Sequence, residues 1–201
     1  GKVAVEDALK DVDGILVAPG FGKRGTEGKI KCLEFARIND IPYLGVCYGM
    51  QMAVIEFARH VCGLKNANST EIDPDTQNPV IDILPEQKEI EGLGGNMRLG
   101  GKDVEVKPNT LAYELYGQKT LIRERFRHRY EVNPKYIPLL EKHGMVFSGK
   151  HPEFEIMQIM EIPGMNFYTG VQFHPEYTSR PLEPNPMYDG LVKAALKSKK
   201  V

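Results

Sequence analysis

A cysteine flanked by two glycines is the residue in this sequence best placed to act as a nucleophile. Gly45-Val46-Cys47-Tyr48-Gly49 joins a short apolar segment to a segment with helical periodicity. A side chain at such a strand-to-helix turn sits on a sharp bend, where flanking glycines leave room for the crowded backbone. The positive end of the following helix is expected to lower the pKa of the Cys47 thiol. The alternative is a buried cysteine packed at a tight turn, the role expected for Cys32 and Cys62.

His174 is the histidine best placed to act as the base for such a cysteine. It follows the apolar segment 168–173, and catalytic side chains of α/β sheets lie at the carboxyl ends of strands. Pro175 restricts the backbone that follows, and Glu176 is close enough to accept the second ring N–H. A histidine in a surface turn is the alternative interpretation. The other histidines that compete for the role are His60, His128, His143 and His151.

The segments around Cys47 alternate between strand and helix patterns. Residues 14–18 and 41–46 are short, unbroken apolar runs, typical of strands that are covered on both faces of a parallel sheet. Residues 26–37 and 50–63 have apolar residues at helical spacing. Strand, helix, strand and helix in this order predict a βαβ unit that places the cysteine at a strand-to-helix turn.

The rest of the chain has a weaker middle and a stronger end. Residues 66–107 are rich in Asn, Asp, Pro and Gly, and we expect ordered loops there with one short strand at 80–84. Other regular segments are predicted as strands at 145–148, 155–162 and 168–173 and as helices at 134–143 and 186–197. Without a repeat or linker, residues 1–201 are predicted to form one domain. Its class is α/β, with three layers and a mostly parallel central sheet between flanking helices.

The composition excludes several classes of function. The 201 residues include 26 Lys and Arg against 27 Asp and Glu, which gives a net charge of −1 and a pI near 6.6. No nucleic-acid partner is expected, because contacts to phosphates need a surplus of basic residues. No membrane partner is expected either, since no apolar segment approaches the roughly 20 residues of a membrane span. Three cysteines are too few for a disulfide scaffold and indicate a reducing cytoplasm.

Three segments together resemble the class I (triad) glutamine amidotransferases. They are Pro19-Gly20-Phe21-Gly22, Gly45-Val46-Cys47-Tyr48-Gly49-Met50-Gln51 and Gly170-Val171-Gln172-Phe173-His174-Pro175-Glu176. Further segments resemble the CTP synthase group within that family. These are Asn66-Ala67-Asn68-Ser69-Thr70-Glu71, Gly94-Gly95-Asn96-Met97-Arg98-Leu99-Gly100, Arg127-His128-Arg129-Tyr130-Glu131-Val132-Asn133 and Ser179-Arg180-Pro181.

This resemblance implies hydrolysis of glutamine through a thioester. Cys47 would attack the side-chain carboxamide, His174 would protonate the departing ammonia, and Glu176 would orient His174. The backbone N–H groups of Gly20 and Tyr48 would bind the oxyanion, where the loss of one donor typically costs about 10²–10³ in rate.

The resemblance also implies a set of contacts to the substrate. Glu71 would pair with the α-ammonium of glutamine, and Arg129 would bind its carboxylate. The residues implied in binding the glutamine and the oxyanion are Gly20, Phe21, Tyr48, Gln51, Glu71, Arg129 and Tyr130.

Partners beyond this chain follow from the resemblance as well. No cofactor and no metal are expected in this domain. ATP, Mg²⁺ and UTP would bind to a synthetase domain that is absent from the sequence and that would use the ammonia to convert UTP to CTP. GTP would act as an allosteric activator, with its effect expected near residues 94–101, near Arg98 and near Phe21. The full-length enzyme is expected to be a homo-oligomer in the cytoplasm.

The sequence departs from the family's pattern at two positions. Pro-Gly-Gly-Phe-Gly is usual where this chain has Ala18-Pro19-Gly20-Phe21-Gly22, so the proline is shifted by one place. Tyr48 replaces the usual leucine, and its phenol is expected at the wall of the pocket or of an ammonia tunnel. The strand-helix-strand unit that opens this fold is expected to be missing before Gly14, and no phosphate-binding G-x-x-x-x-G-K-[ST] loop is present.

Three alternatives remain open on the sequence. The first is an amidotransferase domain of the GMP synthetase type, and the second is a γ-glutamyl hydrolase with the same triad. The third is a non-catalytic regulatory domain of the same fold. The segments at 66–71 and 127–133 fit the GMP synthetase type less well than the CTP synthase group. The intact Cys47, His174 and Glu176 disfavour a non-catalytic domain.

Overall fold

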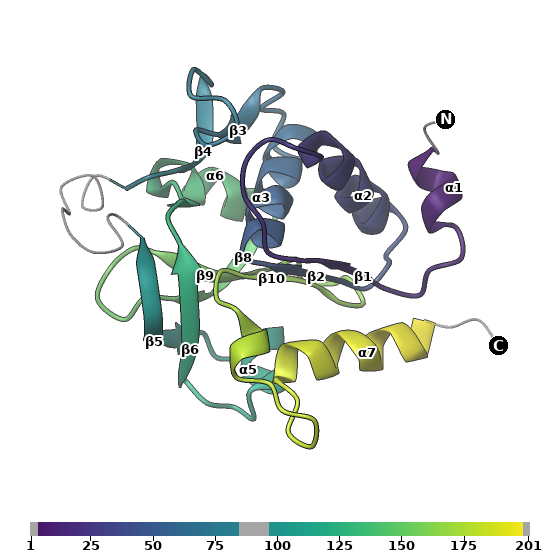
Figure 1. The fold of residues 1–201 in the computed structure, drawn as a ribbon, viewed down its shortest axis with the longest axis vertical. Helices are drawn as coiled ribbons and strands as arrows, with labels where there is room; N and C mark the ends of the chain where they lie inside the picture. Colours follow the sequence, from purple (N-terminus) through teal and green to yellow (C-terminus); the bar gives the residue numbers. More distant parts are fainter. Residues whose placement is uncertain (1–3, 85–96, 199–201) are drawn as a thin grey trace.

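Helices cover both faces of a seven-stranded sheet in the computed structural model, which describes residues 4–84 and 97–198 (Figure 1). The helices are α1 (Val5–Leu9), α2 (Thr26–Ile38), α3 (Tyr48–His60), α5 (Leu111–Leu115), α6 (Ile137–Lys142) and α7 (Pro186–Ser198), with 3₁₀ turns at Pro134–Tyr136 and Pro175–Tyr177. The strands are β1 (Ile15–Val17), β2 (Tyr43–Val46), β3 (Ala67–Ser69), β4 (Asn78–Asp82), β5 (Arg98–Val106), β6 (Leu121–His128), β7 (Glu131–Val132), β8 (Val146–Lys150), β9 (Met157–Glu161) and β10 (Tyr168–Val171).

The large sheet has the order β1-β2-β10-β9-β8-β5-β6, and β3, β4 and β7 form a small second sheet. The α/β class and the layers of flanking helices are confirmed. The expectation of a mostly parallel sheet holds for β1, β2 and β10, which pair in parallel. It needs correction for β9, β8, β5 and β6, which pair antiparallel. The sheet is therefore mixed.

Two apolar cores lie on opposite faces of the sheet. Successive side chains of a strand point to opposite faces, so Tyr43 of β2 packs in the core with α2 and α3, whereas Leu44 packs in the core with α5 and α7. Figure 1 shows α2 and α3 above β1, β2 and β10, with α7 below them. All four residues of β2 are buried, as expected for a strand covered on both faces, whereas in β1 Ile15 and Val17 are buried and Leu16 is exposed.

The βαβ unit around Cys47 forms as predicted. α2 ends one residue later than expected, and α3 begins two residues earlier and ends three residues earlier than expected. Before β1, the described residues 4–14 contain the short helix α1 and no strand. The predicted later strands correspond to β4, β8, β9 and β10, and the predicted helices to α6 and α7.

Two long strands were not predicted. β5 lies inside the segment that was expected to be loops. It was not predicted because Gly100, Gly101 and the charged residues of this strand interrupt the apolar alternation typical of a strand. β6 alternates exposed and buried positions along its whole length. Two of its buried residues are Glu124 and His128, which break the apolar alternation that a sequence pattern relies on. Part of the segment expected to mediate the effect of GTP, residues 94–96, lies outside the described residues.

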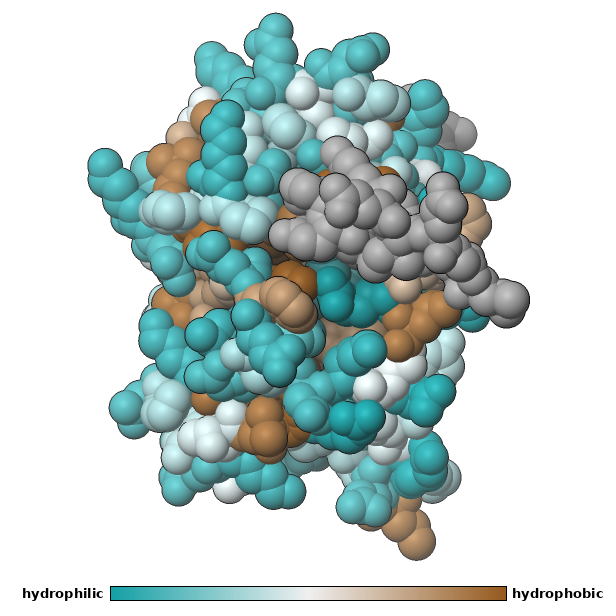
Figure 2. Space-filling model, turned by 90° about the vertical axis from the view of Figure 1, so that its left-hand side faces the viewer, coloured by the Kyte–Doolittle hydropathy of each residue, from teal (hydrophilic) through white to brown (hydrophobic). Residues whose placement is uncertain are grey.

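The surface is mainly polar on the face shown in Figure 2, where apolar side chains form only separate patches. Within the described ranges, no helix has both the length and the apolar character that crossing a membrane requires.

Candidate active site

Cys47 lies on a sharp turn between β2 and α3, and its backbone has φ 52° and ψ −99°. Glycines at both sides are required by close contacts. A Cβ on Gly45 would lie 2.1 Å from the hydroxyl oxygen of Tyr43, and a Cβ on Gly49 would lie 2.3 Å from the carbonyl oxygen of Val17. The Cys47 N–H donates to the Val171 carbonyl at 2.7 Å, which ties the turn to β10. The predicted geometry of a nucleophile turn is therefore present.

His174 follows β10, and its Nδ1 lies 2.7 Å from Oε1 of Glu176. An ionised carboxylate can only accept, so Nδ1 carries the proton and Nε2 of the neutral ring is left as an acceptor. Nε2 is buried and has no hydrogen-bond partner among the described residues. The ring also stacks on Tyr177, with centroids 5.4 Å apart. This arrangement leaves one ring nitrogen available to take a proton.

The side chains of Cys47 and His174 line the same cavity, which has a volume of about 570 Å³. Six of the residues implied in substrate binding line it too: Gly20, Phe21, Gln51, Glu71, Arg129 and Tyr130. They come from the loop after β1, the first turn of α3, the turn after β3 and the turn between β6 and β7. Segments far apart in the sequence thus meet around the thiol.

The thiol itself differs from the sequence-based expectation. Burial raises the pKa of Cys47 to about 12, a hydrogen bond from the Tyr48 backbone N–H opposes this, and the carboxylates of Glu131, Glu176 and Glu71 raise it further. The expected lowering by the start of α3 is outweighed because the sulfur is enclosed and faces negative charge. The resting side chain is therefore a neutral thiol, and its activation requires a base.

Tyr48 is the one substrate-site residue whose side chain does not line the cavity. The phenol is buried under the loop after β1, and its hydroxyl donates to the carbonyl of Gly22. The expectation that the phenol lies at the wall of the pocket is wrong, because the ring turns beneath the loop that carries Gly20 instead of toward the cavity. Its alternative place at the wall of an ammonia tunnel stays a prediction.

Gln172 was not given a role by the sequence, yet it touches the thiol. Its Nε2 lies 3.5 Å from Cys47 Sγ, and its Oε1 accepts from Nε2 of Gln51 at 3.2 Å. The carbonyl of Arg127 lies 3.9 Å from the same sulfur. The position of Gln172, two residues before His174 in the same motif, is the one signal that could have indicated its contact with the site.

β6 also anchors the loop that carries the histidine. The His174 N–H donates to the Arg125 carbonyl at 2.8 Å. The buried carboxylate of Glu124 accepts from the Thr178 hydroxyl and the Asn185 amide, each at 2.7 Å. The position of the base therefore depends on a strand that was not predicted.

A second histidine of the cavity lining, His128 at the end of β6, pairs with Glu131 of β7. His128 Nε2 lies 2.8 Å from Oε1 of Glu131, and the same oxygen accepts from Nε of Arg98 at 2.8 Å. Burial alone would raise the pKa of Glu131, but His128 and Arg98 outweigh it and hold that pKa below its ordinary value. Arg98, expected near the GTP effect, thus belongs to a buried ion cluster next to the site.

The remaining histidines lie in other contacts. His60 Nδ1 is 3.1 Å from Glu56 on the same helix, and His143 Nδ1 is 2.9 Å from the Leu139 carbonyl near the end of α6. His151 packs its ring against Phe154. None of these three lines the cavity around Cys47.

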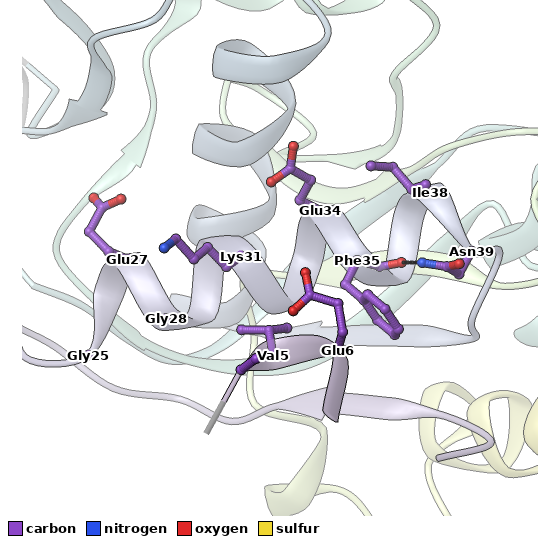
Figure 3. Close-up of a pocket in the computed structure, with 11 residues that line it drawn as sticks. Val5, Glu6, Gly25, Glu27, Gly28, Lys31, Glu34, Phe35, Ile38 and Asn39 are labelled. Atoms are coloured by element: carbon purple, nitrogen blue, oxygen red, sulfur yellow. Dashed lines mark hydrogen bonds between the residues drawn. The ribbon is translucent and has the colours of Figure 1, made fainter. Parts of the chain in front are cut away.

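A larger hollow of about 1300 Å³ lies between α1 and α2, away from these residues. Figure 3 shows Val5 and Glu6 of α1 beside Lys31 and Phe35 of α2. Its lining includes no cysteine or histidine, so it offers no nucleophile or base of the kind found at the smaller cavity. In the described part of the chain, no group of three or more His, Cys, Asp or Glu is arranged to hold a metal ion.

Comparison with known proteins agrees with this geometry. A family model described as glutamine amidotransferase class-I matches residues 2–194. The chain belongs to the glutamine amidotransferase class-I family. It is 55% identical over 193 residues to a CTP synthase of Archaeoglobus fulgidus, covering 96% of this chain and 36% of that protein. It is 56% identical over 188 residues to a CTP synthase of Methanocaldococcus jannaschii, covering 94% of this chain and 35% of that protein.

A solved structure matches the fold closely. The glutaminase domain of Trypanosoma brucei CTPS with bound acivicin aligns with a TM-score of 0.90 and 39% identity, covering 98% of this chain and 75% of that chain. A glutamine amidotransferase from Thermotoga maritima shares the fold at 14% identity, with a TM-score of 0.51. The chain therefore spans 35–36% of the length of the CTP synthases it matches and most of a separately solved glutaminase domain.

Proposed function

We propose that this chain hydrolyses L-glutamine to glutamate and ammonia, with Cys47 as nucleophile, His174 as base and acid, and Glu176 as the group that orients His174. The observation that carries the proposal is the cavity in which a buried thiol and a histidine with an unpartnered Nε2 meet. The 2.7 Å contact of His174 Nδ1 with Glu176 fixes the tautomer that such a base needs.

The first half of the reaction forms a thioester. His174 Nε2 takes the proton of the Cys47 thiol, and the sulfur attacks the side-chain carbonyl carbon of glutamine. The N–H groups of Gly20 and Tyr48 stabilise the oxyanion. The tetrahedral intermediate then expels ammonia, which receives its proton from His174. A thiol whose pKa is raised to about 12 by burial makes this proton transfer necessary.

The second half releases glutamate. Water that loses a proton to His174 Nε2 attacks the glutamyl thioester, and the thiolate that leaves takes this proton back from His174. The same oxyanion donors serve both halves, because each passes through a tetrahedral intermediate at the same carbon. The Tyr48 N–H, which hydrogen-bonds the sulfur in the resting site, is adjacent to the reacting bond in both steps.

Charged and amide groups at the cavity suit an amino acid substrate. Glu71 offers a carboxylate to the α-ammonium, and Arg129 offers a guanidinium to the α-carboxylate. Gln51 Nε2 donates to the Tyr130 carbonyl at 2.9 Å, which joins two of the lining residues. The exposed Phe21 ring, 87% accessible, lies at the rim of the cavity.

The ammonia is proposed to serve a synthetase domain of a CTP synthase. The identity of 54–56% to proteins of that name supports this, and so does the part of each of them that the chain covers. In this proposal ATP, Mg²⁺ and UTP bind to that other domain, and GTP activates the enzyme, a homo-oligomer in the cytoplasm. Residues 1–201 form one glutaminase domain with no cofactor of its own.

Incubation of the chain with L-glutamine tests the proposal directly. Glutamate and ammonia are expected in equal amounts, and the Cys47→Ala variant is expected to release neither. A γ-glutamyl dipeptide serves as the control substrate, because a γ-glutamyl hydrolase would cleave it in preference to glutamine. Preferred cleavage of the dipeptide, or equal glutamine turnover by Cys47→Ala, would contradict the proposal.

A further inference from the structure

Gly22 lies at the centre of the loop between β1 and α2 and is bonded on both sides of its backbone. Its carbonyl accepts a hydrogen bond from the hydroxyl of Tyr48, and its N–H donates a hydrogen bond to Oε1 of Glu71 at 2.8 Å. Gly22 also has a φ of +69°, a conformation that glycine adopts without strain. One loop residue thus joins the start of α3 to the carboxylate proposed to bind the substrate ammonium.

The ring of Tyr48 supports the same loop from below. The side chain is 1% exposed, and a Cβ built on Gly20 would lie 3.4 Å from its Cδ1. The Nζ of Lys29 lies 5.5 Å from the ring centroid, which adds a cation–π contact from α2. Because Tyr48 directly follows Cys47, it ties the nucleophile turn to the loop that carries the Gly20 donor.

The rest of the loop is exposed to solvent. Pro19, Gly20 and Phe21 are all exposed, whereas Gly22 is half-buried. The far end is fixed at α2, where the Thr26 hydroxyl donates to the Lys23 carbonyl at 3.1 Å. The contacts of Gly22 with Tyr48 and Glu71 are therefore the ones nearest to Gly20 that hold the loop against the body of the protein.

We propose that Tyr48 and Glu71 are positioning residues that fix the Gly20 N–H for the oxyanion by holding Gly22 between them. Glu71 then has two tasks, since the carboxylate that pairs with the substrate ammonium also holds the loop. Glutamine binding and placement of the oxyanion donor are coupled through this side chain. The inference rests on the proposed glutaminase function.

Tyr48→Phe tests the hydroxyl alone, because the ring that supports Gly20 remains. We expect kcat for glutamine to fall about three- to tenfold, the range of one neutral hydrogen bond, while KM changes less than about twofold. Tyr168→Phe is the matched control. It removes a buried tyrosine hydroxyl that has no partner among the described residues, and kcat is expected to stay within about twofold.

A pair of substitutions at Glu71 separates its two tasks. Glu71→Gln keeps an oxygen that can accept from the Gly22 N–H but loses the charge, so KM is expected to rise at least about tenfold with kcat within about threefold. Glu71→Ala removes both, so its kcat is expected to fall about tenfold further, toward the cost of a lost oxyanion donor. Thermal unfolding of each variant shows whether the fold is retained.

Labelling of Cys47 by a glutamine-like diazo ketone separates failure of this inference from failure of the proposed function. The thiol adds to the diazo carbon as RS–CH₂–CO–R′, with its proton on that carbon and N₂ released. A labelled Cys47 with unchanged kcat in Tyr48→Phe, or equal kcat in Glu71→Gln and Glu71→Ala, would overturn the inference alone. An unlabelled Cys47 in the parent chain that also hydrolyses no glutamine would overturn the function and the inference together.

Discussion

Two histidines that line one cavity each pair with a carboxylate, and the two carboxylates differ in their surroundings. His174 and Glu176 are 2.7 Å apart, and His128 and Glu131 are 2.8 Å apart. The side chain of Glu176 is 38% exposed, whereas that of Glu131 is 0% exposed and also binds Arg98. Contact distance therefore does not separate the two pairs, but their environments do.

The difference indicates separate tasks. His174 uses Nδ1 for its carboxylate and keeps Nε2 for the cavity, at the end of a parallel strand next to the nucleophile turn. His128 uses Nε2 for a carboxylate that is shared with the guanidinium of Arg98, and its Nδ1 is buried without a hydrogen-bond partner among the described residues. A base must exchange protons, whereas a buried ion cluster is disrupted when one of its charges changes. We therefore assign the chemistry to the pair at 174 and 176.

Exchanging each histidine for asparagine gives the largest expected contrast. His174→Asn removes the base and is expected to lower kcat for glutamine by at least about 10³-fold. His128→Asn is expected to lower it by less than about tenfold. Steady-state glutamate release by the two purified variants checks this, and a larger loss in His128→Asn would reverse the assignment.

Removal of each carboxylate is expected to have the opposite order in stability. Glu131→Ala leaves Arg98 and His128 without their shared partner and is expected to lower the free energy of unfolding by about 3–5 kcal/mol. Glu176→Ala removes a partly exposed partner and is expected to cost about 1 kcal/mol or less. Urea unfolding at pH 7 measures both. Equal losses would mean that burial does not distinguish the pairs.

Glu176→Gln sharpens the comparison in activity. The amide can still contact His174 Nδ1, but it no longer stabilises a charged imidazole, so kcat is expected to fall about ten- to a hundredfold, equivalent to about 1.5–3 kcal/mol. Glu131→Gln, purified in folded form, is the matched control with an expected change of less than about threefold. A larger effect at Glu131 than at Glu176 would be inconsistent with the assigned roles.

The smallest predicted effect is a pH dependence of stability from Glu131. His128 and Arg98 outweigh burial and lower the pKa of this carboxyl in the folded state from the ordinary value of 4.5. The contribution of this carboxylate to the free energy of unfolding is therefore complete above about pH 4.5, and it is lost as the pH falls through the lower folded-state pKa. It amounts to about 1.4 kcal/mol for each pH unit by which the folded-state pKa lies below the unfolded-state pKa.

Unfolding of the parent and of Glu131→Gln at pH 7 and pH 3 measures this contribution. The stability difference between the two proteins is expected to shrink at pH 3. A difference that stays the same at both pH values would show that the charge of Glu131 does not contribute.

Local patterns were enough to predict the elements that carry the nucleophile and the base. The apolar runs of β1, β2 and β10 and the helical spacing of α2 and α3 are properties of contiguous residues, and each element was confirmed. β6 could not be predicted in this way, because its buried positions include Glu124, whose partners Thr178 and Asn185 lie on distant segments, and His128, which pairs with Glu131 three residues away. The second His–Glu pair lies within the segment 127–133, but the partner that it shares, Arg98, comes from β5, a strand that no local pattern indicated.

The predicted site residues meet at one cavity, except for the side chain of Tyr48. The spacing of the motifs was enough to identify these residues as members of one site. The direction of their side chains and the electrostatics around them depend on the assembled fold. The phenol of Tyr48 points under the loop, and enclosure of the Cys47 sulfur raises a pKa that the start of α3 was expected to lower. Gln172 contacts the thiol because β10 lies beside the nucleophile turn, an arrangement that no local pattern contains.

Site-resolved labelling with a glutamine-like diazo ketone tests the central assignment most directly. Mass spectrometry of the digested chain is expected to show one adduct on Cys47, none on the corresponding peptide of Cys47→Ala, and protection of Cys47 by excess glutamine. An adduct confined to Cys32 or Cys62, with Cys47 unmodified, would contradict the account.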